Sequence, residues 1–233
     1  MSIAQNLALV RDRIAAAARC AGRQPEDIAL MAVSKTFPAE RIREAYDAGL
    51  RLFGENRVQE FAGKTDALRD LHSAEWHLIG HLQTNKAAKA VELFAAVDSV
   101  DSLRLAQRLN ASAQQVEKKL KVFIEINVGG EAAKSGVAPE SRELEELLSA
   151  APELEHLEFR GLMTIPPFTD DPQKARPYFR KLRELRDQIG RRLPGFNMRE
   201  LSMGMSHDFE VAIEEGSTCV RVGTAIFGER STK

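Results

Sequence analysis

Cysteine is scarce in this sequence: Cys20 and Cys219 are the two examples among 233 residues. Two thiols are too few for a disulfide framework or a zinc cluster, and their sequence settings predict buried thiols in a reducing compartment. A secretory signal is lacking as well, because charged residues interrupt the helical pattern of residues 1–23. No apolar stretch reaches membrane-spanning length. We therefore expect a cytoplasmic protein that makes no membrane contact.

An excess of charge of either sign is also lacking, since 33 basic residues are balanced by 34 acidic ones. No net field directs the protein towards nucleic acid, and we expect partners that are small molecules. Low-complexity tracts, solenoid repeats and linker-like breaks in composition are not visible. A chain of this length suits one α/β barrel, so we predict that residues 1–233 form a single domain.

What the chain does contain is a regular alternation of helical patterns and short apolar runs. It opens with apolar residues at helical spacing, which predict a helix over residues 3–21. Eight strand-like runs follow, at residues 28–34, 50–56, 75–82, 95–101, 121–128, 157–165, 199–206 and 218–227. Helical patterns lie between them, at residues 38–48, 57–70, 85–94, 102–119, 139–150, 172–190 and 207–215.

Repeated strand–helix units imply a parallel sheet with right-handed crossovers, and eight units close a TIM barrel. An open doubly wound sheet is the competing architecture. We favour the barrel because the units continue evenly to the end of the sequence without a break in composition. The predicted fold is an α/β TIM (β/α)8 barrel with an extra N-terminal helix.

Lys35 ends the first apolar run, in "AVSKT", where a lysine needs a reason because its charge is costly to bury. Function in a TIM barrel lies at the C-terminal ends of the strands. Other runs also end in polar residues: Glu55, Asn56, His81, Gln83, Ser99, Asp101 and Asn127. For Gln83, Asp101 and Asn127 the start of a loop is an equally good explanation. Lys35 is therefore the first candidate for a reactive group.

Two fragments near the C-terminus indicate a phosphate site. "LSMGMSHDFEVAI" passes through Gly204 to Ser206, which with Asp208 can cap the next helix and leave free backbone N–H groups at its start. "CVRVGTAIFG" adds Gly223 and the Thr224 hydroxyl. Barrels of this kind commonly bind phosphate in the loops after strands seven and eight, where both fragments fall. Together they predict a bound phosphate.

A lysine and a phosphate site at one mouth suggest a ligand that is both a phosphate ester and a carbonyl compound. Two chemistries fit: a Schiff base with a sugar phosphate, as in aldolases, or with pyridoxal 5′-phosphate, PLP. Arg221 alternates with Val220 and Val222, so its side chain is expected inside the barrel. A guanidinium beside the pyridine nitrogen suits PLP, whereas pairing with a carboxylate from another strand is the alternative explanation.

Six stretches of the chain resemble one known family. They are "AVSKT" at 32–36, "FGENRVQE" at 53–60, "WHLIGHLQTNK" at 76–86, "GLMTIP" at 161–166, "LSMGMSHD" at 201–208 and "VRVGTAIFG" at 220–228. The family is that of the pyridoxal-phosphate-binding homeostasis proteins, single-domain relatives of the N-terminal barrel of alanine racemase. The stretches are spread over nearly the whole chain, and their combination is highly specific.

The resemblance implies a PLP site built by nine residues. Lys35 would carry the Schiff base, Arg221 would face the pyridine nitrogen, and Asn56 would lie near the ring hydroxyl. The phosphate would be surrounded by Ser202, Met203, Gly204, Ser206, Gly223 and Thr224. The sequence departs from the family at Arg57, where an aromatic residue is frequent, and at Gly129 and Ala133, in a loop usually richer in serine.

The family is associated with cellular PLP supply and has no established enzymatic reaction, so the resemblance implies a non-catalytic PLP carrier or regulator. Alanine racemase uses a second acid–base group, a tyrosine from a further domain of a partner subunit, and we expect no such domain here. Tyr46 and Tyr178 lie in helical patterns. Arg221 would also leave the pyridine nitrogen unprotonated, which weakens the ring as an electron sink. A small PLP-dependent amino-acid racemase and a Schiff-base aldolase are the alternatives.

Three further expectations concern partners, metals and cofactor release. We expect a monomer that contacts PLP-dependent apoenzymes transiently. His77, His81 and His207 lack carboxylates at ligand spacing, so we interpret them as core or mouth histidines and predict no metal site. Lys134 follows the fifth strand, and its amine is either a group that helps to move PLP off Lys35 or a solvated loop lysine.

Overall fold

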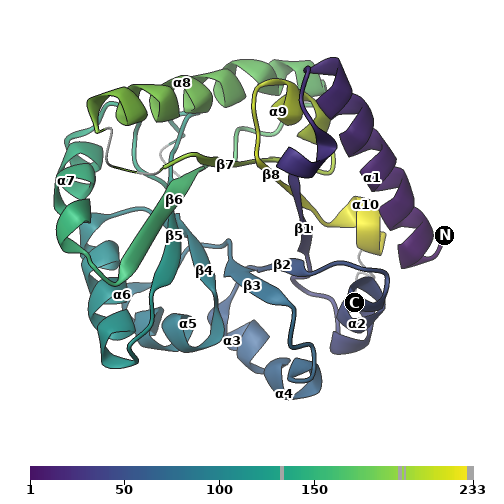
Figure 1. Ribbon diagram of the computed structural model, residues 1–233, viewed down its shortest axis with the longest axis horizontal. Coiled ribbons are helices and arrows are strands. Elements are labelled where there is room, and N and C mark those ends of the chain that lie inside the picture. Colours follow the sequence, from purple (N-terminus) through teal and green to yellow (C-terminus); the bar gives the residue numbers. More distant parts are fainter. Residues whose placement is uncertain (132–133, 194–195, 197, 230–233) are drawn as a thin grey trace.

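The computed structural model describes the whole chain except residues 132–133, 194–195, 197 and 230–233. Eight parallel strands each pair with the next, and β8 pairs with β1, so the sheet closes into a barrel (Figure 1). The strands are β1 (Ala29–Val33), β2 (Leu52–Glu55), β3 (Glu75–Leu78), β4 (Ala96–Val100), β5 (Leu120–Glu125), β6 (Leu157–Met163), β7 (Glu200–Met205) and β8 (Cys219–Val222). The predicted TIM barrel is confirmed.

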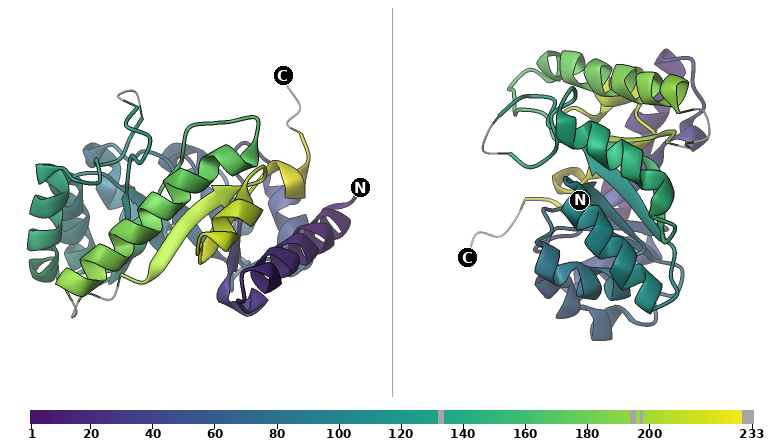
Figure 2. Two further views of the ribbon diagram at one scale, coloured as in Figure 1. Left: turned by 90° about the horizontal axis from the view of Figure 1, so that it is seen from above. Right: turned by 90° about the vertical axis from the view of Figure 1, so that its left-hand side faces the viewer.

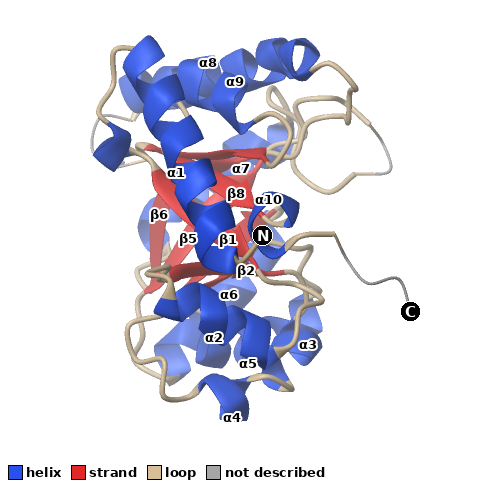
Figure 3. Cartoon of the chain, turned by 90° about the vertical axis from the view of Figure 1, so that its right-hand side faces the viewer, coloured by secondary structure: helices blue, strands red, loops and turns tan. Residues whose placement is uncertain are grey.

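Helices surround the strands on the outside, as the blue and red elements of Figure 3 and the two turned views of Figure 2 show. They are α1 (Ile3–Cys20), α2 (Ala39–Asp47), α3 (Val58–Ala62), α4 (Thr65–Leu68), α5 (Ala87–Leu93), α6 (Leu103–Gln115), α7 (Arg142–Ala150), α8 (Arg176–Arg192), α9 (Phe209–Glu214) and α10 (Thr224–Phe227). Four 3₁₀ turns complete the described elements: η1 (Pro25–Asp27), η2 (Thr84–Lys86), η3 (Ala151–Glu153) and η4 (Pro172–Ala175).

The extra N-terminal helix is present as α1, and its start is fixed locally. Ser2 and Gln5 form a capping box, in which each side chain bonds the backbone of the other residue. The apolar stripe of α1, which begins with Ile3 and Leu7, is buried, and the helix packs on α9 and α10 beside the first and last strands. Among the described helices, none is both long and apolar enough to cross a membrane.

Two apolar cores hold the barrel. The larger one lies between the sheet and the helices, while Met31, Ile79 and Cys219 form a small separate cluster. Strand alternation explains the division: Ala32 faces the helices and its neighbour Met31 faces the interior of the barrel. The inner cluster brings together residues from β1 and β8 and the residue after β3, and its Ile79 lines the cavity described below.

Several boundaries differ from the sequence prediction, and three of them bear on the mouth or on the elements around it. The eighth apolar run does not continue as a strand, because the chain leaves the extended conformation at Gly223 and residues 224–227 form α10. The helix predicted over 57–70 is divided into α3 and α4 at Gly63, a residue that weakens helices. β3 ends at Leu78, so His81 lies in the following loop.

The prediction that both thiols are buried is confirmed for Cys219 and wrong for Cys20. Cys219 is buried inside the barrel, and burial raises the pKa of its thiol to about 12. Cys20 is exposed, because the last residue of α1 falls on the face of the helix that points away from the sheet.

Candidate functional site

A cavity of about 270 Å³ opens at the carboxyl ends of the strands, where function lies in barrels of this type. Residues at or just after the ends of β1, β2, β3, β6, β7 and β8 line it. Six of the nine predicted site residues are among them: Lys35, Asn56, Ser206, Arg221, Gly223 and Thr224. Ser202, Met203 and Gly204 lie on β7, outside this lining.

Arg221 lies inside the barrel, as its alternation with two valines predicted, and it is 3% exposed. Its Nη1 donates to the backbone oxygen of Ser202 at 2.6 Å and to the Ser202 hydroxyl at 2.8 Å, and its Nη2 donates to the carbonyl of Thr164 at 2.7 Å. Arg221 makes no ion pair with any described residue, so the alternative of a paired carboxylate is not what the structure contains. The guanidinium is held by neutral oxygens and retains further N–H groups.

A series of hydrogen-bonded side chains, which the sequence did not predict, connects Arg221 to the neighbouring strands. Ser202 donates its hydroxyl to Asp98 Oδ2 at 3.4 Å, and Asp98 Oδ1 accepts from His77 Nδ1 at 2.9 Å. Burial lowers the pKa of His77, but the charges and hydrogen bonds of Asp98 and Glu75 outweigh burial and raise it to about 9. His77 is therefore the core histidine of the three, and its interaction with Asp98 crosses from β3 to β4.

Ser206 and Gly223 join the two predicted phosphate loops. The Ser206 hydroxyl accepts from the backbone N–H of Gly223 at 3.3 Å and from that of Ala225 at 3.4 Å. Two backbone donors from the start of α10 thus converge on one oxygen beside Lys35 and Thr224 in the cavity lining. A phosphate oxygen suits such a position, because backbone N–H groups are good donors to anions.

The predicted cap of α9 by Ser206 and Asp208 is wrong. Asp208 stands at the N-cap position, but its carboxylate turns back and accepts from the N–H of Met205 at 2.7 Å. Ser206 is engaged by the β8 loop instead. The Asp208 carboxylate therefore closes the turn after β7, and it does not cap α9.

Met203 and Gly204 support the site from behind. Met203 is fully buried in the core between the sheet and the helices. Gly204 has a φ of 93°, and a Cβ there would come within 2.6 Å of Ala212 Cβ in α9. Glycine is thus required for the close approach of β7 and α9, which places the following loop at the mouth.

Gly80 was not among the predicted site residues, although its lack of a side chain makes room for Asn56. A Cβ at position 80 would lie 2.2 Å from the backbone oxygen and 2.6 Å from Oδ1 of Asn56. Position 80 therefore requires glycine, because a side chain there would displace Asn56 from its place in the cavity lining. The signal was the glycine in "WHLIGHL", at the end of an apolar run where a glycine marks close backbone approach.

Glu125, at the end of β5, is a second residue near Arg221 that the sequence did not single out. It is 7% exposed, and its Oε2 has no hydrogen-bond partner among the described residues. Burial raises the pKa of Glu125 to about 7, and the nearby charge of Asp101 adds to the rise, while Arg221 and His81 oppose it. A carboxyl at the end of β5 therefore titrates near neutral pH.

Of the other two candidate histidines, His207 lies at the mouth and His81 lies in the loop after β3. His207 lines the cavity, donates through Nε2 to the carbonyl of Asp170 at 3.1 Å and contacts the ring of Phe168. His81 is exposed and its Nδ1 bonds Asp101 at 3.1 Å. The part of the chain that the structure describes contains no group of three or more His, Cys, Asp or Glu side chains arranged to hold a metal.

Lys134 lies behind the wall of the cavity. Its Nζ pairs with Glu131 and donates to the carbonyl of Pro166 at 3.2 Å, and Pro166 lines the cavity. Of the family departures, Gly129 packs against Pro167, Arg57 is exposed at the start of α3, and Ala133 lies outside the described residues. The hypothesis that Lys134 moves PLP off Lys35 stays a prediction.

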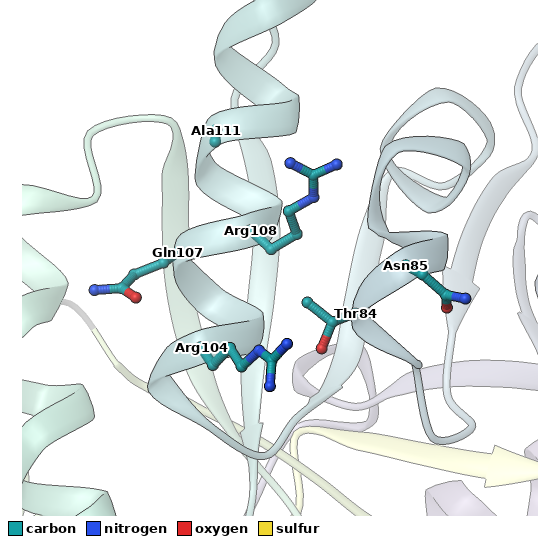
Figure 4. Close-up of a pocket in the computed structure, with 6 residues that line it drawn as sticks. All are labelled: Thr84, Asn85, Arg104, Gln107, Arg108 and Ala111. Carbon is teal, nitrogen blue, oxygen red and sulfur yellow. The ribbon is translucent and has the colours of Figure 1, made fainter.

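A second hollow, of about 490 Å³, lies on the outside of the barrel between η2 and α6 (Figure 4). Figure 4 shows Arg104 and Arg108 projecting from α6 on one side, with Thr84 and Asn85 on the other. None of the predicted site residues lines it. Its walls are exposed side chains without a reactive lysine or converging backbone donors, so the smaller mouth cavity is the candidate site.

Known proteins are similar to this chain in sequence and share its barrel fold. The sequence matches the family described as "Alanine racemase, N-terminal domain" over residues 5–231. It is 49% identical to the pyridoxal phosphate homeostasis protein of Aquifex aeolicus, over 99% of both chains. It is 47% identical to that of Pseudomonas aeruginosa, over 98% of this chain and 96% of the relative. The chain therefore belongs to the pyridoxal phosphate homeostasis protein family.

Solved structures agree with this family. PipY of Synechococcus elongatus, determined with PLP bound, is 39% identical and superposes with a TM-score of 0.86 over 97% of this chain and 100% of that chain. A Bifidobacterium adolescentis protein of unknown function, also 39% identical, has a TM-score of 0.89 over 96% of this chain and 94% of that chain. Alanine racemase of Clostridium difficile shares the fold, with a TM-score of 0.70 at 17% identity over 98% of this chain and 58% of the racemase.

Proposed function

We propose that this protein binds PLP in the mouth cavity as a Schiff base of Lys35 and takes part in intracellular PLP homeostasis without catalysing a reaction of its own. The observation that carries the proposal is the meeting of Lys35, Arg221 and the joined Ser206–Gly223 loops in one cavity. The bound PLP in the PipY structure and the name shared by the curated relatives support it.

The residues of the mouth fit the parts of PLP. Lys35 would supply the amine that holds the aldehyde of PLP as an imine, a condensation that releases the aldehyde oxygen as water. Arg221 has five N–H groups, of which the bonds to Ser202 and Thr164 use three, so a donor remains for the pyridine nitrogen. Asn56 would lie beside the ring hydroxyl.

The phosphate would lie where Ser206 now gathers the N–H groups of Gly223 and Ala225, with the Thr224 hydroxyl beside it. Ser202, Met203 and Gly204 would then serve this site indirectly. Ser202 orients Arg221, while Met203 and Gly204 fix β7 against the outer core and α9. In this reading three of the nine predicted residues support the ligand contacts made by the other six.

The carrier reading follows from the same geometry. A permanent cation at the pyridine nitrogen disfavours ring protonation, and PLP supplies carbanion stabilisation best when that nitrogen is protonated. Tyr46 and Tyr178 belong to α2 and α8 and are not part of the cavity lining. We extend the proposal to a cytoplasmic monomer of one domain, residues 1–233, that passes PLP to apoenzymes by transient contact.

Borohydride trapping tests the assignment of Lys35. The purified protein with PLP should show the visible absorbance of a PLP Schiff base, and reduction should attach a pyridoxyl group to Lys35. Lys35→Ala should lose the absorbance and keep the fold, because the cavity wall loses only a flexible side chain. Lys89→Ala is the control, since Lys89 is an exposed lysine that pairs with Glu92 on α5. A label found mainly on another lysine of the wild-type protein would disprove the assignment.

A further inference from the structure

The loop that carries Lys35 has a strained backbone. Thr36 has a φ of 68°, in the left-handed region that β-branched residues rarely adopt. Such a conformation persists only where surrounding contacts hold it. One contact is the turn's own hydrogen bond, from the N–H of Phe37 to the carbonyl of Ser34 at 3.1 Å, and the others come from the segment that follows β2.

Both peptide groups that flank Lys35 are bound by this segment. In the preceding peptide, the carbonyl of Ser34 accepts a hydrogen bond from Lys64 Nζ at 3.4 Å. In the following peptide, the N–H of Thr36 donates to Glu60 Oε1 at 2.5 Å. Contacts on both sides of the Lys35 Cα fix the direction in which its side chain leaves the strand.

Glu55, Glu60 and Lys64 form one charged cluster, which we call the loop clamp. Lys64 Nζ lies 3.2 Å from Glu55 and 2.9 Å from Glu60, and Glu55 also accepts from the Ser34 hydroxyl at 2.7 Å. Glu55 is fully buried, and Lys64 exposes 12% of its side chain. Buried ion clusters often stabilise a fold no better than apolar packing does, so this one needs another reason.

The charges of the loop clamp suit its contacts. Burial raises the pKa of Glu60, but the hydrogen bonds from Lys64 and from the Thr36 backbone outweigh burial, and the net pKa is lowered. Glu60 is therefore an anion at neutral pH, and a charged acceptor makes the stronger hydrogen bond to a backbone N–H. That bond holds the left-handed turn in addition to the turn's own hydrogen bond between Phe37 and Ser34.

We infer that Glu60 and Lys64 are positioning residues that hold Thr36 in its left-handed conformation and thereby aim Lys35 into the mouth cavity. The inference rests on the proposed function, because the ligand of Lys35 is PLP in that proposal. Neither residue lines the cavity, so both act through the backbone of the Lys35 loop. The loop clamp prepares the lysine to meet the aldehyde.

Substitutions at Glu60 separate the hydrogen bond from the bulk of the side chain. Glu60→Ala removes the acceptor for Thr36, so we expect the Kd for PLP to rise about tenfold and the Thr36 amide to exchange with solvent about tenfold faster. Glu60→Gln retains a side-chain oxygen and should stay within about threefold of wild type in both measurements. Asp70→Asn is the control, because it breaks an exposed ion pair with Arg43 near the same segment without touching the Lys35 loop.

A double-mutant cycle with Thr36→Gly distinguishes positioning from general support. Glycine adopts a φ of 68° without strain, so the turn depends less on the loop clamp when residue 36 is glycine. The loss of PLP affinity on Glu60→Ala should therefore be several-fold smaller in the Thr36→Gly background. A merely structural Glu60 would give the same loss in both backgrounds.

The outcomes are distinct. If the wild-type protein forms no Schiff base, the proposed function and this inference both fail. If the wild-type protein binds PLP and Glu60→Ala binds it as tightly as Asp70→Asn does, only the inference is wrong. Faster exchange at Thr36 with unchanged PLP affinity also overturns the inference, because the turn would then be held without effect on Lys35.

Discussion

At the residue scale, Glu125 gives the barrel a pH dependence. Its carboxyl has an ordinary pKa of 4.5 and a pKa of about 7 in the folded protein, because burial and the Asp101 charge disfavour the ionised form. Between these values the folded state binds a proton that the unfolded state has lost, so the free energy of unfolding falls as the pH rises from about 4.5 to about 7. Below 4.5 and above 7 this residue contributes no slope.

Glu125→Gln should remove that slope, because glutamine does not titrate. We expect the free energy of unfolding of the wild type to fall by roughly 3 kcal/mol, relative to that of the variant, between about pH 4.5 and about pH 7.5. Urea unfolding of both proteins across this pH range gives the difference between their free energies of unfolding. The contributions of the other titrating groups cancel in that difference. A constant difference between the two proteins would show that Glu125 has an ordinary pKa.

At the element scale, the turns after β7 and β8 act together, since Ser206 in one binds the backbone N–H groups of the other. Neither turn contains a complete anion site, but side by side they offer the donors that the phosphate of PLP requires. The β5 loop supports the opposite wall, where Lys134 binds the carbonyl of Pro166. The mouth is thus shaped by contacts between loops that are far apart in the sequence.

Pyridoxal, which lacks the phosphate, should bind much more weakly than PLP. It can form the Schiff base with Lys35 but forfeits the charge-assisted hydrogen bonds at Gly223 and Ala225, each worth about 1.5–3 kcal/mol. Titration of the visible absorbance gives both affinities, and inorganic phosphate should compete with PLP. Equal affinities for pyridoxal and PLP would remove the phosphate from this position.

Gly204→Ala should destabilise the protein by about 1–3 kcal/mol, because alanine is strained at a φ of 93° and its Cβ meets Ala212. The displaced β7–α9 turn should also weaken PLP binding. Gly190→Ala is the matched control: it lies in α8, a Cβ there meets nothing within 4 Å, and helix propensity predicts a gain of up to about 1 kcal/mol. Urea unfolding measures both changes, and equal effects would contradict this account.

At the scale of the whole molecule, Lys35, Arg221 and the backbone donors near Ser206 meet at the same mouth, and on this arrangement we base the proposal of a PLP carrier. Racemisation needs proton removal on one face of the bound amino acid and delivery on the other, and a positioned acid–base group contributes roughly 10²–10⁴-fold. The tyrosines lie in α2 and α8, away from the cavity lining. In the proposed site, Arg221 beside the pyridine nitrogen would further limit carbanion stabilisation.

We therefore predict no useful racemisation by the PLP-loaded protein. Chiral analysis of alanine and serine incubated with it measures the reaction, and Lys35→Ala with free PLP is the control for chemistry of the cofactor alone. Turnover that depends on Lys35 at about 1 s⁻¹ or faster would replace the carrier reading with the racemase alternative.

The sequence predicted the architecture because each strand–helix unit shows its own periodicity, and the regular count of eight closed the barrel. It located Lys35 and Arg221 for local reasons as well: one ends an apolar strand and the other alternates with valines. It placed the end of β8 wrongly, because the apolar residues of α10 continue the apolar pattern of the strand. It also assigned Ser206 to the wrong partner, since a hydroxyl beside a helix start is a cap unless another loop approaches it.

Local pattern by itself determined the fold class, the lysine and the two glycine-bearing loops, because backbone propensity and side-chain periodicity act between residues close in sequence. Tertiary structure decided which of those residues share a cavity and what holds them. The bond from Ser202 to Asp98, the packing of Gly80 on Asn56 and the loop clamp around Lys35 join residues from different strands and loops. Such contacts leave no periodic trace in the sequence, since their partners come from separate strand–helix units that only the tertiary structure brings together.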